Sequence, residues 1–69
     1  MAFSENLQYI RSRTGVTQEQ LAEQLGVSRQ SVSKWESGAS FPEMDTLLRL
    51  CDLYSLTLDL LLRGDLKRA

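Results

Sequence analysis

Polar side chains of the types that read DNA bases recur between residues 29 and 37 of this chain, and five of them lie on one side of the predicted helix. At 100° per residue they share one half of a helical wheel: Arg29, Gln30, Ser33, Lys34 and Ser37. Arginine and lysine can hydrogen-bond guanine, and glutamine can pair with adenine through two hydrogen bonds. Val32 and Trp35 occupy the other half, which predicts a helix with one packed face and one polar face. A solvated surface helix would show the same pattern, so the preceding residues must distinguish the two.

The segment before this helix forces a sharp turn. Only Gly26, Val27 and Ser28 separate two predicted helices, so the second helix must fold back against the first. Gly26 can adopt the left-handed conformation that ends a helix, and Ala22 is small where two backbones come close. This spacing is what a helix-turn-helix requires, although helical hairpins in proteins that do not bind DNA share it.

Glycines and the one proline punctuate the whole chain. They divide it into five predicted helices, at about residues 4–14, 18–25, 29–37, 42–54 and 58–63. Ser4, Ser28 and Thr57 are the expected N-caps, and Thr17 with Gln20 has the spacing of a capping box. Each predicted helix therefore has a local signal at one of its ends.

Length and composition bound the fold class and exclude several functions. One domain is all that 69 residues allow, and we expect an all-α fold, a compact five-helix bundle, over residues 1–64. Residues 65–69 are expected to be a frayed tail or the start of a linker. Cys51 is the only cysteine and histidine is absent, so we expect no disulfide, no metal, no cofactor and no enzyme activity. No apolar run approaches the roughly 20 residues that span a bilayer and no signal peptide opens the chain, which favours a cytoplasmic protein.

Charge is less informative than the helix pattern. Eight basic and nine acidic residues give a net charge of −1, which argues against a nonspecific coat on nucleic acid. It does not exclude DNA binding, because the charge on one face decides that.

The apolar residues of the C-terminal half exceed what one small core requires. Ten of the thirteen leucines lie from Leu47 onward. The surplus is greatest at Leu56, Leu58, Leu60, Leu61 and Leu62. They indicate either a few exposed leucines, which are common, or a functional surface. That surface would be a weak dimer interface in the fifth predicted helix or a face that a missing segment covers. The inner face of the fourth is expected to hold Met44, Leu47, Leu48 and Cys51. We interpret Trp35 and Cys51 as core residues, not as a base-stacking platform and a redox switch.

Residues 4–64 resemble the helix-turn-helix domain of the lambda-type phage repressors and Cro proteins, the XRE-type regulators. Residues 17–28 (TQEQLAEQLGVS) are similar to the first motif helix and turn of that family, and residues 31–38 (SVSKWESG) are similar to its recognition helix. Phe41-Pro42 with the leucine-rich helix that follows, and residues 55–61, resemble the last two helices of that family. The resemblance implies a five-helix bundle that binds operator DNA, generally as a dimer.

The resemblance also implies roles for individual residues. Gln18 matches the family position that bonds a DNA phosphate, Lys34 matches one that contacts base or backbone, and Arg11 with Glu36 matches a pair that ties two helices together. The positions that face the major groove are matched by Ser28, Arg29, Gln30 and Ser33. Those near a second stretch of phosphates are matched by Ser37, Ser40 and Phe41. Residues 39–41 carry no cation where relatives often have lysine or arginine.

We therefore expect sequence-specific binding of double-stranded operator DNA by a transcriptional regulator, a repressor. A homodimer on DNA would read half-sites about 34 Å apart. The alternative is a protein-interaction module of the same fold, such as an antitoxin.

Overall fold

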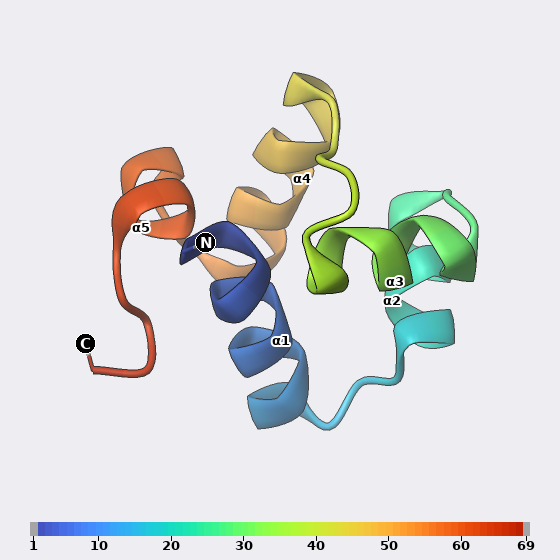
Figure 1. Ribbon diagram of the computed structural model, residues 1–69, viewed down its shortest axis with the longest axis horizontal. Helices are drawn as coiled ribbons and strands as arrows, with labels where there is room; N and C mark the ends of the chain where they lie inside the picture. The colour runs from blue at the N-terminus through green and yellow to red at the C-terminus, as the bar shows by residue number, and fades with distance from the viewer. Residues whose placement is uncertain (1, 69) are drawn as a thin grey trace.

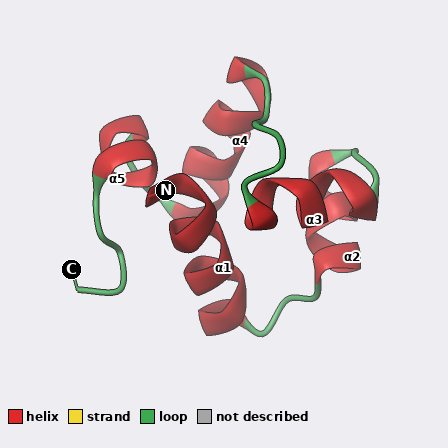
Figure 2. Cartoon of the chain, viewed as in Figure 1, coloured by secondary structure: helices red, strands yellow, loops and turns green. Residues whose placement is uncertain are grey.

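The computed structural model describes residues 2–68, and in that range all regular structure is helical (Figures 1 and 2). The helices are α1 (Ala2–Thr14), α2 (Gln18–Leu25), α3 (Arg29–Ser37), α4 (Met44–Tyr54) and α5 (Leu58–Arg63). Helix α1 lies in the middle and packs against α3 on one side and α5 on the other (Figure 1). The all-α five-helix fold is confirmed. None of these helices has both the length and the apolar character to cross a membrane.

The turn between α2 and α3 forms as its sequence predicts. Gly26 has φ +70°, and its N–H group donates to carbonyl oxygens of the last turn of α2. Ser28 follows as the N-cap of α3, and its hydroxyl accepts a hydrogen bond of 3.1 Å from the backbone N–H of Ser31. At the other end of α2, Thr17 and Gln20 form both bonds of the capping box. Local signals on both sides therefore fix how α3 leaves α2.

The hydrophobic core lies between α1, α2 and α3, and α4 and α5 contribute buried residues to it. Leu7, Leu21, Val32 and Leu61 are completely buried in it, and Trp35 and Cys51 are buried as expected. Burial raises the pKa of the Cys51 thiol, which favours its protonated form.

Two helix starts differ from the sequence prediction. Helix α1 begins at Ala2, so Ser4 is a buried residue inside the helix and not its N-cap. The cause is Phe3, which is buried and meets Phe41 edge to face with ring centroids 4.8 Å apart. Helix α4 begins at Met44, because Pro42 is buried in the extended segment that precedes it.

The inner face of α4 was predicted correctly for Leu47 and Cys51 and wrongly for Met44 and Leu48. Leu47, Leu50 and Cys51 are its buried residues, whereas Met44 is 57% exposed and Leu48 is 49% exposed. The predicted and the observed sets of apolar residues both have helical spacing. The positions of α2 and α5 therefore decide which set is buried.

The C-terminal leucines are largely accounted for by the core. Leu61 is buried, and Leu56, Leu58 and Leu62 pack against the core while partly exposed. Only Leu60, at 39% exposure, stands out among the large exposed apolar residues of α5. The apolar surplus therefore gives little support to a dimer interface in α5.

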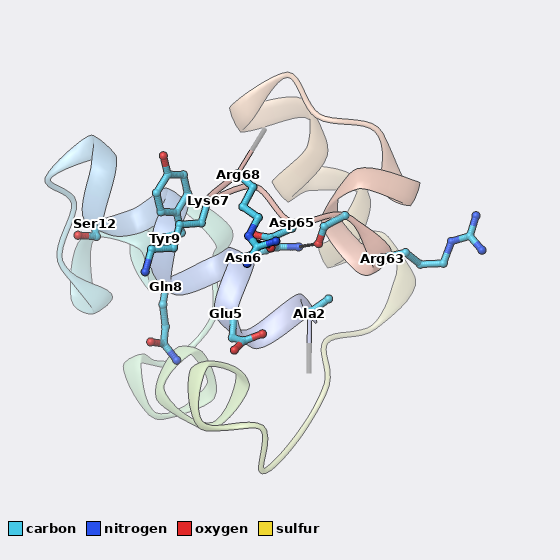
Figure 3. Close-up of a pocket in the computed structure, with 11 residues that line it drawn as sticks. Ala2, Glu5, Asn6, Gln8, Tyr9, Ser12, Arg63, Asp65, Lys67 and Arg68 are labelled. Atoms are coloured by element: carbon cyan, nitrogen blue, oxygen red, sulfur yellow. Dashed lines mark hydrogen bonds and ion pairs between the residues drawn. The ribbon is translucent and has the colours of Figure 1, made fainter.

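A buried amide joins the two ends of the domain. Asn6 of α1 donates from Nδ2 to the carbonyl oxygens of Leu61 and Gly64, both at 2.9 Å, and of Leu60 at 3.3 Å. Its Oδ1 accepts a bond of 3.1 Å from the backbone N–H of Leu66, which is buried. Figure 3 shows Asn6 beside the tail that carries Asp65. The tail is thus held as far as Leu66, and Ala69 lies outside the described residues.

We expect Asn6→Ala to lower the free energy of unfolding by about 2 kcal/mol, since buried groups of the chain end would lose their partners. Urea denaturation measures this, and exposed Gln24→Ala is the matched control that should leave stability unchanged. Hydrogen exchange of the Leu66 amide should accelerate in the same variant. Unchanged protection of that amide would contradict the role given to Asn6.

Candidate nucleic-acid interface

The polar face of α3 is open to solvent. Arg29, Gln30 and Lys34 are exposed, Ser33 is half-buried, and Val32, Trp35 and Glu36 form the buried side of the helix. Among the residues that the structure describes, none hydrogen-bonds the side chain of Gln30 or of Lys34. Two long polar side chains, at i and i+4, are therefore free to contact a ligand along one side of α3.

Two of the predicted site residues also hold the ends of α3. The Ser28 hydroxyl caps the first turn, and the Ser37 hydroxyl donates to the carbonyl of Lys34 at 3.0 Å. Ser40, in the loop after α3, is exposed, as is Phe41. Each of these hydroxyls makes two hydrogen bonds, and a hydroxyl with one donor and two acceptor positions can still make a third to a ligand.

The pair expected between Arg11 and Glu36 is present and bidentate. Arg11 Nε lies 2.6 Å from Glu36 Oε2, and Arg11 Nη2 lies 3.1 Å from Oε1. Glu36 is 7% exposed and Arg11 24%, so the pair lies at the edge of the core. The carboxylate raises the pKa of Arg11 and keeps it charged. Arg11 Nη1 also donates to the Val16 carbonyl at 3.1 Å, which ties in the loop before α2.

Glu36 has two further contacts. Gln8 of α1 donates to its backbone carbonyl at 2.6 Å, and Figure 3 shows the Gln8 side chain extending from α1 towards α3. Gln18 Nε2, from the first residue of α2, donates to Glu36 Oε1 at 3.0 Å. Sequence reasoning missed Gln8, since a polar residue on an exposed helix position carries no signal of a partner 28 residues away.

Gln18 is also linked to the polar face of α3. Arg29 Nη1 lies 3.5 Å from Gln18 Oε1, at the outer limit of a hydrogen bond. The half-buried Gln18 therefore lies between the buried Glu36 and the exposed Arg29. The two predicted site residues are brought together by the turn that connects their helices.

Acidic residues follow the loop after α3. Glu43 occupies the N-cap position of α4 without a side-chain cap, and Asp45 accepts from the backbone N–H of Thr46 at 2.9 Å. Their charges oppose an approaching phosphate at the start of α4. Cationic contact must therefore come from α3 on this side of the molecule.

Two hollows of the described surface are lined mainly by residues outside the polar face of α3. An open groove of about 1030 Å³ runs between α1 and residues 63–68, with charges of both signs along it (Figure 3). A smaller apolar hollow of about 190 Å³ lies behind the loop at Phe41. Within residues 2–68 no cluster of three or more potential metal ligands forms.

Comparison with known proteins places this geometry in context. Residues 2–63 match the family described as "Helix-turn-helix domain". The HTH-type transcriptional activator BcrR of Enterococcus faecalis is 51% identical over 65 residues, which are 94% of this chain and 32% of that protein. The uncharacterized HTH-type transcriptional regulator YgzD of Bacillus subtilis is 36% identical, over 72% of this chain and 76% of that protein.

Solved structures agree with the sequence matches. The P22 c2 repressor, crystallised in complex with a synthetic operator, superposes with a TM-score of 0.86 at 29% identity, over 94% of this chain and 98% of that one. Several relatives are longer than this chain, which spans 32% of BcrR and 54% of the regulator YqaE of Bacillus subtilis.

Proposed function

This chain belongs to the helix-turn-helix family of transcriptional regulators, and we propose that it binds double-stranded operator DNA by placing α3 in the major groove. The observation that carries the proposal is the exposed polar face of α3, where Arg29, Gln30 and Lys34 point away from the core. Exposed polar side chains in this arrangement fit the docking of a recognition helix. The likeness to a repressor that is bound to an operator supports the same orientation.

Within this proposal the residues divide by role. Arg29 and Gln30, in the first turn of α3, read bases, because the N-terminal residues of a recognition helix reach the base edges. Ser28 and Ser33 flank them in the groove. Gln18, Lys34, Ser37 and Ser40 contact the backbone. We propose that this chain recognises DNA and does not catalyse a reaction, and that it acts in the cytoplasm.

The proposal also includes the oligomeric state of the protein on DNA and whether it represses or activates transcription. We infer a homodimer on DNA that reads two half-sites related by a two-fold axis, about 34 Å apart. Repression is our proposal from the resemblance to phage repressors, although the relative BcrR is named a transcriptional activator. We propose residues 1–64 as the DNA-binding domain, with the tail that follows packed against it as far as the buried Leu66.

Salt dependence of duplex binding tests the proposal against its rival, a protein-interaction module such as an antitoxin. A DNA binder releases counterions, so log K should fall linearly with log salt, by about 0.9 for each phosphate neutralised. The few cations near α3 predict a shallow but clear slope. The absence of any duplex binding at low salt would favour the rival.

Lys34→Ala should flatten that slope by about 1 and weaken binding to all duplexes similarly. Lys34 lies in the last turn of α3, beyond the residues that reach the bases, so we assign it to a phosphate. Lys67→Ala is the matched control, since the other lysine lies in the tail beside α1. A change of base preference in Lys34→Ala would instead place Lys34 on a base.

A further inference from the structure

The contacts around Glu36 form a continuous path from the core to the polar face of α3. Arg11 donates to Glu36, Gln18 donates to Glu36 Oε1 at 3.0 Å, and Arg29 approaches Gln18 Oε1 at 3.5 Å. Each link joins a donor to an acceptor. The path crosses α1, α3 and α2 and returns to the first residue of α3.

The hydrogen-bonding chemistry of Glu36 and Arg29 fixes the orientation of the Gln18 amide between them. A carboxylate can only accept hydrogen bonds, so Gln18 must present Nε2 to Glu36. A guanidinium can only donate, so Gln18 must present Oε1 to Arg29. Both requirements are met by one orientation of the amide, and the flipped amide would satisfy neither.

Glu36 is the rigid end of this path. Its side chain is buried, Arg11 holds both of its carboxylate oxygens, and Gln8 holds its backbone carbonyl. Arg29, by contrast, is exposed and carries a long flexible side chain. A bidentate contact to a base needs the plane of the guanidinium to be set, and side chains that are preorganised lose less entropy on binding.

On the basis of the proposed function, we propose that Glu36 is a specificity-determining positioning residue, which sets the orientation of Arg29 through the amide of Gln18. Glu36 does not contact DNA in this account. Its effect on base preference is confined to the base pair that Arg29 reads. The pair with Arg11 therefore has a second task besides joining α1 to α3, because it holds the acceptor that orients Gln18.

The first test replaces Glu36 with its neutral isostere. In Glu36→Gln one of the two carboxylate positions becomes a donor, so Arg11 and Gln18 compete for a single acceptor and the Gln18 amide loses its fixed orientation. Dissociation constants are measured on the operator and on its single-base variants. We expect the preference at the base pair read by Arg29 to fall about 3- to 10-fold, within the range of coupling between contacting residues.

A second variant tests the path without disturbing the ion pair. Gln18→Met has nearly the same length, cannot orient Arg29 and leaves Arg11 bound to Glu36. It should lose the same preference even if Glu36→Gln folds poorly. When Glu36→Gln is added to a protein that already carries Gln18→Met, the preference should not fall any further.

Gln8→Ala is the structural control, since it removes the other side-chain contact to Glu36 but lies outside the path to Arg29. Gln8→Ala should leave every base preference intact. Glu36→Gln and Gln18→Met should leave the preference at the base pair read by Gln30 intact. A purely structural role of Glu36 would weaken all sequences equally. If Arg29→Ala removes a preference that Glu36→Gln and Gln18→Met both retain, this inference is wrong while the proposed function stands. If Arg29→Ala removes none, the assignment of Arg29 fails and the inference fails with it.

Discussion

Glu36→Ala should lower the free energy of unfolding by about 3 kcal/mol, because removing one partner of a buried ion pair leaves the other uncompensated. Arg11 would lose both bonds to the carboxylate and Gln18 would lose its acceptor. The value is set at the low end for such pairs, since Arg11 remains 24% exposed and water can reach it. Urea denaturation followed by circular dichroism measures the change.

Glu23→Ala is the matched control for this experiment, because Glu23 is an exposed glutamate on α2. It should change stability by no more than about 0.5 kcal/mol. DNA binding should weaken in Glu36→Ala and stay unchanged in Glu23→Ala. An unchanged denaturation midpoint in Glu36→Ala would show that the pair is only a surface contact.

Gln30→Ala and Arg29→Ala should each cost about 1–3 kcal/mol on the best operator and relax the preference at one base pair, as expected for a lost bidentate contact. Neither change should unfold the domain, since both side chains are exposed and point away from Val32 and Trp35. Titrations on the operator and its single-base variants measure both effects.

Arg63→Ala serves as the control for lost positive charge, because Arg63 is an exposed arginine in the last turn of α5. It should leave base preferences intact. If Gln30→Ala and Arg29→Ala leave them intact as well, α3 is not the reading helix, and the protein-interaction module becomes the better account.

The helix-turn-helix could be predicted from sequence because its determinants are local. The capping box at Thr17, the left-handed Gly26 and the N-cap Ser28 act within a few residues of one another. Such signals do not depend on the rest of the fold. The exposed polar face of α3 followed from them, because Val32 and Trp35 leave only one way to turn the helix.

Long-range packing determined what the sequence could not predict. Which row of α4 is buried depends on α2 and α5, and the start of α1 depends on the contact between Phe3 and Phe41. Asn6 is a polar residue within the apolar stripe of α1, a signal that could have indicated a buried amide. Its partners, 54 to 60 residues away, could not be read from the chain.

The pair between Arg11 and Glu36 came from the family resemblance and is present in the structure. Its link to Gln18 did not, because the resemblance assigned Gln18 only to a phosphate. A residue can hold both roles, since the second Nε2–H of Gln18 remains available to DNA.

Selection of binding sites from random duplexes tests the central claim most directly, because the selection itself identifies the operator. If a homodimer reads an operator through α3, one sequence should be enriched, arranged as two half-sites about 34 Å apart. Two copies of the protein should bind each selected duplex. Recovery of duplexes with no sequence in common, at a salt concentration where the protein is folded, would contradict that claim.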